Sequence, residues 1–156
     1  MGLDMYLSEK QWHRVSDVTR LRALRDILDV DALPVGEMTV TTDVEHIYWR
    51  KANAIHGWFV DNIQDGEDDC GEYPVAREDL QKLKNLCEQV LEDPDLADDL
   101  LPARPGCFFG SQQYGEDYLE DLRHTVTSID ELIKHLTVRR LKDPNYVFKL
   151  VYQSSW

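Results

Sequence analysis

The side chains best suited to bind a small molecule lie close together in the first half of the chain. Trp49, Asn53 and His56 are spaced by four and three residues, so on a helix they would share one face. That face would offer a flat aromatic surface, an amide and an imidazole that titrates near neutral pH. With Arg50 and Lys51 beside this face, the sequence predicts a site for a nucleotide-like ligand. The alternative is that Trp49 and His56 are core residues with satisfied ring nitrogens.

An acidic loop follows this segment. Counted from Asp61, carboxylates stand at positions 1, 5, 9 and 12 and glycine at position 6, which resembles the calcium loop of helix–loop–helix proteins. Two residues depart from that pattern: Ile63 replaces an oxygen ligand, and Asp68 replaces the usual apolar residue. We therefore predict no metal and no other cofactor. The weak candidate ligands are Asp61, Asp65, Asp69 and Glu72.

The imidazole and the acidic loop also allow a small metal-dependent or acid–base enzyme centred on His56. Asp69 or Glu72 would then orient the ring. No nucleophile motif or phosphate-binding loop accompanies these residues, so binding without catalysis is favoured and no catalytic residue is assigned. The side chains predicted to bind the ligand are Trp49, Arg50, Lys51, Asn53, His56, Asp69, Glu72 and Tyr73.

A small α+β fold is expected to position these residues. Alternating apolar residues predict a strand over 3–7, and β-branched and aromatic residues predict strands over 38–42 and 146–152. Apolar residues at helical spacing predict helices over 16–28, 43–62, 78–92 and 118–136. We expect a single globular domain over 1–156, in which a small antiparallel sheet including both terminal strands packs against three or four helices.

The charge of the chain is strongly one-sided. Its net charge is −13, and residues 61–101 hold 14 of the 30 acidic residues against 3 of the 17 basic ones. Such a field repels nucleic acids and anionic membranes, so direct binding to either is not expected. It suits instead a second function, in which residues 61–101 present carboxylates to a basic host protein, as an inhibitor or a DNA mimic.

Other features of the sequence bear on its compartment and assembly. It has no apolar run of the roughly 20 residues that a membrane span needs, and its first residues lack the basic start of a signal peptide. Three cysteines, an odd number, favour reduced thiols in a cytoplasm over a disulfide framework. Four tryptophans and seven tyrosines are enough to supply a homodimer interface.

Four segments resemble a family of short, mostly uncharacterised bacteriophage proteins. They are 1–7 (MGLDMYL), 49–56 (WRKANAIH), 66–73 (GEDDCGEY) and 152–156 (YQSSW), well under half of the chain. The resemblance brings no catalytic residue. It implies a context, the cytoplasm of an infected bacterial host cell, and an accessory role such as anti-defence. The expected function is then a non-enzymatic binder of a small nucleotide-like ligand that modulates the host.

Overall fold

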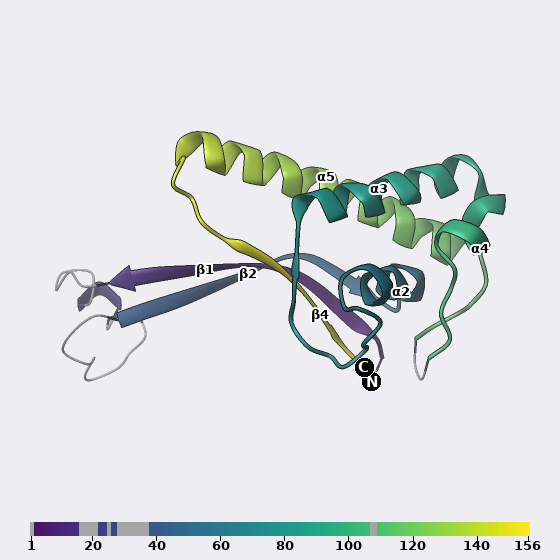
Figure 1. Cartoon of the computed structure of the whole chain (residues 1–156), viewed down its shortest axis with the longest axis horizontal. Helices are drawn as coiled ribbons and strands as arrows, with labels where there is room; N and C mark the ends of the chain where they lie inside the picture. The colour runs from purple at the N-terminus through teal and green to yellow at the C-terminus, as the bar shows by residue number, and fades with distance from the viewer. Residues whose placement is uncertain (1, 16–21, 25, 28–37, 107–108) are drawn as a thin grey trace.

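A four-stranded antiparallel sheet forms one layer of the fold, with its strands in the order β2-β1-β4-β3 (Figure 1). The computed structural model describes residues 2–15, 22–24, 26–27, 38–106 and 109–156. The strands are β1 (Asp4–Val15), β2 (Met38–Arg50), β3 (Tyr73–Val75) and β4 (Lys149–Ser155). The predicted α+β class is confirmed, and the strands nearest the two termini, β1 and β4, pair at the centre of the sheet.

Strand β2 is longer than predicted and replaces the first part of a predicted helix. It runs to Arg50, so the helix expected over 43–62 is wrong up to residue 52, and helix α2 spans only Asn53–Asn62. Ile47 and Trp49 are buried while Tyr48 is exposed, which is the two-residue period of a strand with one covered face. The partner strand β1 is long enough to pair along the whole length of this segment, with one register shift between Leu7 and Ser8.

Two long helices cover one face of the sheet. Helix α3 (Arg77–Glu92) confirms the helix predicted over 78–92, and α5 (Glu116–Lys142) extends the one predicted over 118–136. They lie side by side in Figure 1. A 3-10 turn η1 (Pro94–Leu96) and a short helix α4 (Ala97–Leu100) follow α3. The helix predicted over 16–28 lies largely outside the described residues.

The hydrophobic core fills the space between the sheet and the helices. Leu3, directly before β1, and Met5 and Leu7 on the strand are fully buried at every second position and belong to this core. The helices contribute their apolar stripes. The buried stripe residues are Leu80, Leu83, Cys87 and Val90 of α3, and Leu122, Ile129, Leu132 and Leu136 of α5. Within the described ranges, no helix is both long and apolar enough to span a bilayer.

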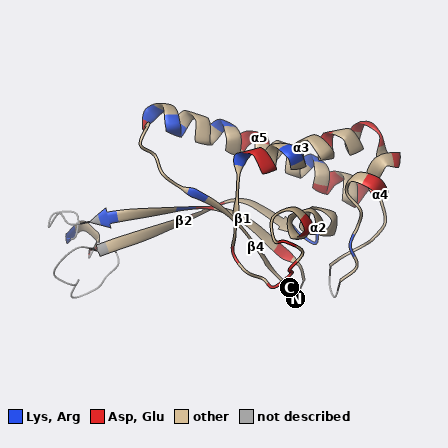
Figure 2. Cartoon of the chain, in the orientation of Figure 1, with Lys and Arg blue, Asp and Glu red and all other residues tan. Residues whose placement is uncertain are grey.

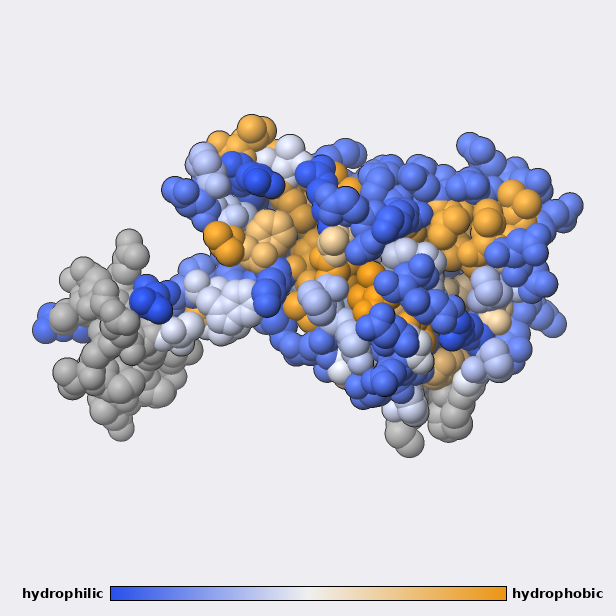
Figure 3. Space-filling view, in the orientation of Figure 1, coloured by the Kyte–Doolittle hydropathy of each residue, from blue (hydrophilic) through white to orange (hydrophobic). Residues whose placement is uncertain are grey.

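Opposite charges gather at the two ends of the helical layer. Basic residues Arg139, Arg140 and Lys142 occupy the last turn of α5, whereas acidic residues crowd the end of α3 and α4 (Figure 2). In the space-filling view, hydrophobic surface gathers in a band between the helices and the sheet, and most of the remaining visible surface is hydrophilic (Figure 3). The molecule therefore has a strong charge asymmetry along α5.

Candidate functional site

Residues from the four segments 1–7, 49–56, 66–73 and 152–156 meet at one end of the sheet. The backbone N–H of Lys51 donates to the carbonyl of Leu3 at 2.8 Å. The Gln153 amide donates to the carbonyl of Cys70 at 3.2 Å, and Asp4 pairs with Ser155 across the sheet. Segments that are far apart in the sequence thus form one neighbourhood.

His56 is at the centre of this neighbourhood and is buried, with only 1% of its surface exposed. Its Nε2 lies 3.0 Å from Asp68 Oδ2, and its Nδ1 lies 2.7 Å from the hydroxyl of Tyr152. Because a carboxylate only accepts, we assign Nε2–H as the donor to Asp68 and Nδ1 as the acceptor from Tyr152. Burial raises the pKa of Tyr152 well above its usual value, which keeps that hydroxyl protonated. Both ring nitrogens are therefore used inside the protein.

The partner of His56 is Asp68, and not Asp69 or Glu72 as predicted. Asp68 also accepts a hydrogen bond of 3.0 Å from the indole N–H of Trp156. This carboxylate therefore links α2 to the residues at the end of β4. The Asp68–His56–Tyr152 chain joins three separate segments, with His56 and Tyr152 buried and Asp68 partly exposed.

Trp49 does not share a face with Asn53 and His56, which corrects the prediction. It lies on β2, is 2% exposed, and donates its indole N–H to the Thr125 hydroxyl of α5 at 2.9 Å. The aromatic surface expected for stacking is instead part of the core, packed edge-on against Phe59 with ring centroids 5.8 Å apart. The helical spacing misled because the helix begins four residues after Trp49.

Asn53 is also fully used by the protein. Its amide nitrogen donates to the carbonyls of Phe109 and Ser111 at 3.1 and 2.8 Å, and its oxygen accepts from the Arg104 backbone N–H at 3.0 Å. One buried side chain thereby holds the loop that leads into α5. Asn53 shapes the wall of the site and has no amide hydrogen left for a ligand.

The acidic loop does not arrange its carboxylates around a common point. Asp61 pairs with Arg104, Glu72 pairs with Lys10 at 2.5 Å, and Asp69 accepts from the backbone N–H of Gly71 at 2.8 Å. Among the residues that the structure describes, these candidates and Asp65 form no group of three converging ligand atoms. Tyr73 lies on β3, where it pairs with Tyr152.

A cavity of about 520 Å³ does bring several predicted residues together. Its walls are the junction of β2 and α2, the loop 110–115 and the first turns of α5. Arg50, Lys51 and Asn53 line the first wall. Gly110 has φ +94°, and an added Cβ would lie 3.1 Å from Lys51 Cβ, so glycine allows the loop to approach this junction.

Carboxylates line the α5 wall of the cavity. They are Glu116, Asp117, Glu120 and Asp121, all from the first turns of α5. Burial raises the pKa of Asp121 to about 6, with smaller contributions from neighbouring charges. The raised pKa of this carboxyl indicates that part of the cavity wall is poorly solvated.

Sequence reasoning missed the α5 wall of this cavity. Asp121 stands directly before Leu122 of the apolar stripe, so its position at the border of the buried face was the available signal. Nothing in the sequence separated it from the other acids of the helix. Ser111 and Gln113 of the cavity lie in a loop whose path depends on Asn53.

No protein-family model, no curated protein and no solved structure matches this chain. The function is therefore inferred from the cavity and the groups around it.

Proposed function

We propose that this protein binds a small polar ligand, of the nucleoside phosphate type, in the cavity between the β2–α2 junction and the start of α5. The observation that carries the proposal is that two cations, Arg50 and Lys51, and the carboxylates of the first turns of α5 line one space of about 520 Å³. This volume lies within the range of small-molecule sites. A nucleoside phosphate has an anionic end for the cations and hydroxyl and amino donors for the carboxylates.

Binding without chemistry suits this cavity. His56 is not among its lining residues, and both imidazole nitrogens are hydrogen-bonded elsewhere. In the bacteriophage context implied by the sequence resemblance, such a protein would sequester a nucleotide signal of the host. The cavity needs no metal or cofactor for that role.

Calorimetric titration with a panel of nucleoside mono- and diphosphates tests the proposal. Arg50→Gln removes one cation from the wall and should weaken binding about 10-fold, because a charge-assisted hydrogen bond contributes about 1.5 kcal/mol or more. Asp121→Asn should weaken binding of the same ligand from the other wall. Lys82→Gln, an exposed charge change on α3, is the matched control and should bind as the wild type does.

Folded protein that binds none of these ligands would refute the proposed function. Equal affinity in the wild type and Arg50→Gln would also refute it, since the cations would then contribute nothing. Circular dichroism of each variant establishes that the fold is retained.

A second candidate function is binding of a basic protein, favoured by the acidic end of the helical layer. The residues concerned are exposed: Glu92, Asp93, Asp95, Asp98 and Asp99. They form no ion pair with any residue that the structure describes. The segment that holds them, from the end of α3 to α4, lies at one end of the molecule in Figure 2. Capture of a basic host protein at low salt would support this function if the capture is lost at high salt. It should also be lost in a triple variant, Asp95→Asn, Asp98→Asn and Asp99→Asn.

A further inference from the structure

Two histidines and a buried glutamate converge at a second place, away from the cavity. The buried alternation that begins at Leu3 and includes Met5 and Leu7 of β1 continues along this strand with two polar residues, Glu9 and Gln11, which are 1% and 7% exposed. A carboxylate in this position has lost its water and must be matched by polar partners. Burial raises the pKa of Glu9, but hydrogen bonds from Tyr146, Gln11 and His46 outweigh it, so the net pKa is lowered.

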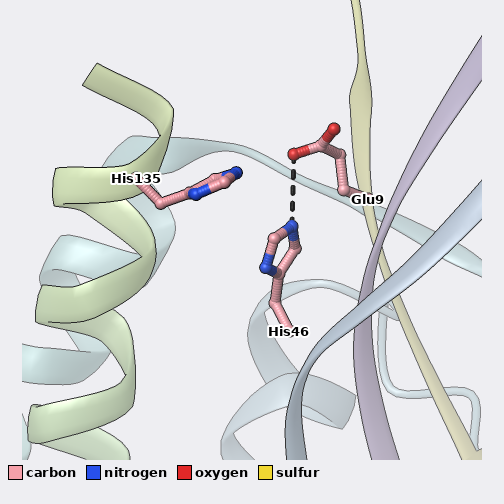
Figure 4. A group of neighbouring side chains, drawn as sticks. All are labelled: Glu9, His46 and His135. Atoms are coloured by element: carbon pink, nitrogen blue, oxygen red, sulfur yellow. Dashed lines mark hydrogen bonds and ion pairs between the residues drawn. The ribbon is translucent and has the colours of Figure 1, made fainter. Parts of the chain in front are cut away.

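A β-bulge brings His46 to Glu9. Leu7 pairs with Ile47 and Ser8 pairs with Glu45, so His46 is the extra residue of β2 with no partner on β1. Bulges redirect side chains in this way and are frequent next to functional sites. As a result His46 Nε2 lies 3.2 Å from Glu9 Oε2 (Figure 4).

The third group comes from α5. His135 lies above the bulge, and its ring centroid is 5.2 Å from that of His46. One ligand atom from each of Glu9, His46 and His135 can be chosen so that all three lie within 4.8 Å of one another. Figure 4 shows the three side chains approaching a common space from β1, β2 and α5.

The other oxygen of Glu9 is held by the protein. Oε1 accepts hydrogen bonds from the Gln11 amide and the Tyr146 hydroxyl. Tyr146 in turn accepts from Arg139 Nη2 at 3.0 Å. These contacts fix the carboxylate and leave Oε2 directed at the two imidazoles, which is the supporting arrangement that metal-ligating carboxylates have.

We propose that Glu9, His46 and His135 bind a divalent transition-metal ion of the zinc class. Two imidazole nitrogens and one carboxylate oxygen are a ligand set that such ions favour, whereas calcium and magnesium prefer oxygen alone. In a tetrahedral zinc site, ligand atoms are about 3.4 Å apart, given metal–ligand distances of about 2.1 Å. The Glu9–His46 separation of 3.2 Å already fits, and the exposed His135, whose ligand atom lies within 4.8 Å of the other two, has to approach by at most about 1.4 Å.

Three protein ligands leave a fourth position for water or another small ligand. The ion would also connect the middle of the β1–β2 pair to the second half of α5. This site is independent of the cavity proposed for nucleoside phosphates, because it shares no residue with it.

Equilibrium dialysis and calorimetry with Zn²⁺, and visible absorption with Co²⁺, test the site on the full chain. We expect one ion per chain and a melting temperature raised by Zn²⁺, while Mg²⁺ and Ca²⁺ have no such effect. His135→Ala should weaken Zn²⁺ binding at least 10-fold and change the Co²⁺ spectrum. Its exposed position on a helix leaves the fold intact. Tyr146→Phe removes the hydroxyl that donates to Glu9 and accepts from Gln11 and Arg139, and it leaves all three ligands in place, so it should weaken binding about 10-fold.

The control is His13→Ala, which removes an exposed imidazole of β1 outside the cluster and should bind as the wild type does. Wild-type protein that binds neither Zn²⁺ nor Co²⁺ would overturn the proposal and leave only the Glu9–His46 hydrogen bond. Zn²⁺ binding that is unchanged in both His46→Ala and His135→Ala would overturn it too, because the ions would then be bound by surface carboxylates.

Discussion

Replacing Asn53 by alanine is the most direct test of how the ligand cavity is built. The substitution removes three hydrogen bonds, to the carbonyls of Phe109 and Ser111 and from the N–H of Arg104. A typical intramolecular hydrogen bond contributes about 1 kcal/mol, which gives about 3 kcal/mol for the three. Ser111 is exposed, so its carbonyl can bind water instead, and we expect a net loss of about 2 kcal/mol.

Urea denaturation followed by tryptophan fluorescence measures this loss. With a slope of about 2 kcal/mol per molar urea, the midpoint should fall by about 1 M. Asn53→Asp is the informative second variant, since it keeps an acceptor for Arg104 but directs a carboxylate oxygen at two carbonyls. It should destabilise at least as much as alanine does. Asn85→Ala, exposed on α3, should change stability by less than about 0.5 kcal/mol.

A loss below about 0.5 kcal/mol in Asn53→Ala would refute the reasoning. It would mean that the loop around residues 104–111 keeps its position without the amide. The affinity of Asn53→Ala for nucleoside phosphates is a second measurement. It should be weaker than in the wild type, because a displaced loop removes one wall of the cavity.

Three further predictions concern buried groups. Trp49→Phe should cost about 1–3 kcal/mol in urea denaturation, through the lost bond to Thr125 and the lost volume, and a stability equal to wild type would contradict the burial of Trp49. Burial raises the pKa of Cys87 to about 12, so in a variant without the other two cysteines a thiol reagent at pH 8 should react only after unfolding. Because the pKa of Asp121 is raised to about 6 from 3.8, the folded chain holds an extra proton between about pH 4 and 6. The stability that this group contributes should therefore fall as the pH rises through that range, and Asp121→Asn should exceed the wild type in stability at pH 7 but not at pH 4.

The sequence predicted the elements whose patterns are local. Helix α3 was predicted from the apolar stripe of Leu80, Leu83, Cys87 and Val90. Strand β1 was predicted from the alternation of Leu3, Met5 and Leu7. The helix predicted over 43–62 was wrong up to residue 52. Trp49, Asn53 and His56 fit a helical spacing, but the pairing with β1 favours a strand up to Arg50. Long-range pairing overrides local spacing here.

The candidate site was only partly predictable, for the same reason. Arg50 and Lys51 do line the cavity, but the carboxylates that also line it belong to α5, which only the tertiary structure brings near. The Glu9–His46–His135 cluster was missed altogether. Its one sequence signal was Glu9, a polar residue that continues the apolar alternation of β1. The β-bulge that brings His46 to Glu9 cannot be predicted from the sequence pattern alone.

The central position of β4 has a consequence for how the chain folds. β4 pairs with β1 from opposite ends of the sequence, and its Tyr152 ring stacks on Phe59 of α2 with centroids 3.9 Å apart. Contacts between residues so far apart in the sequence form late, because the entropy cost of closing a long loop comes before the contacts contribute any stabilising free energy. A growing polypeptide on the ribosome therefore exposes one bare edge of β1 until residues 149–155 have emerged, and during that interval it is most prone to pair with another chain.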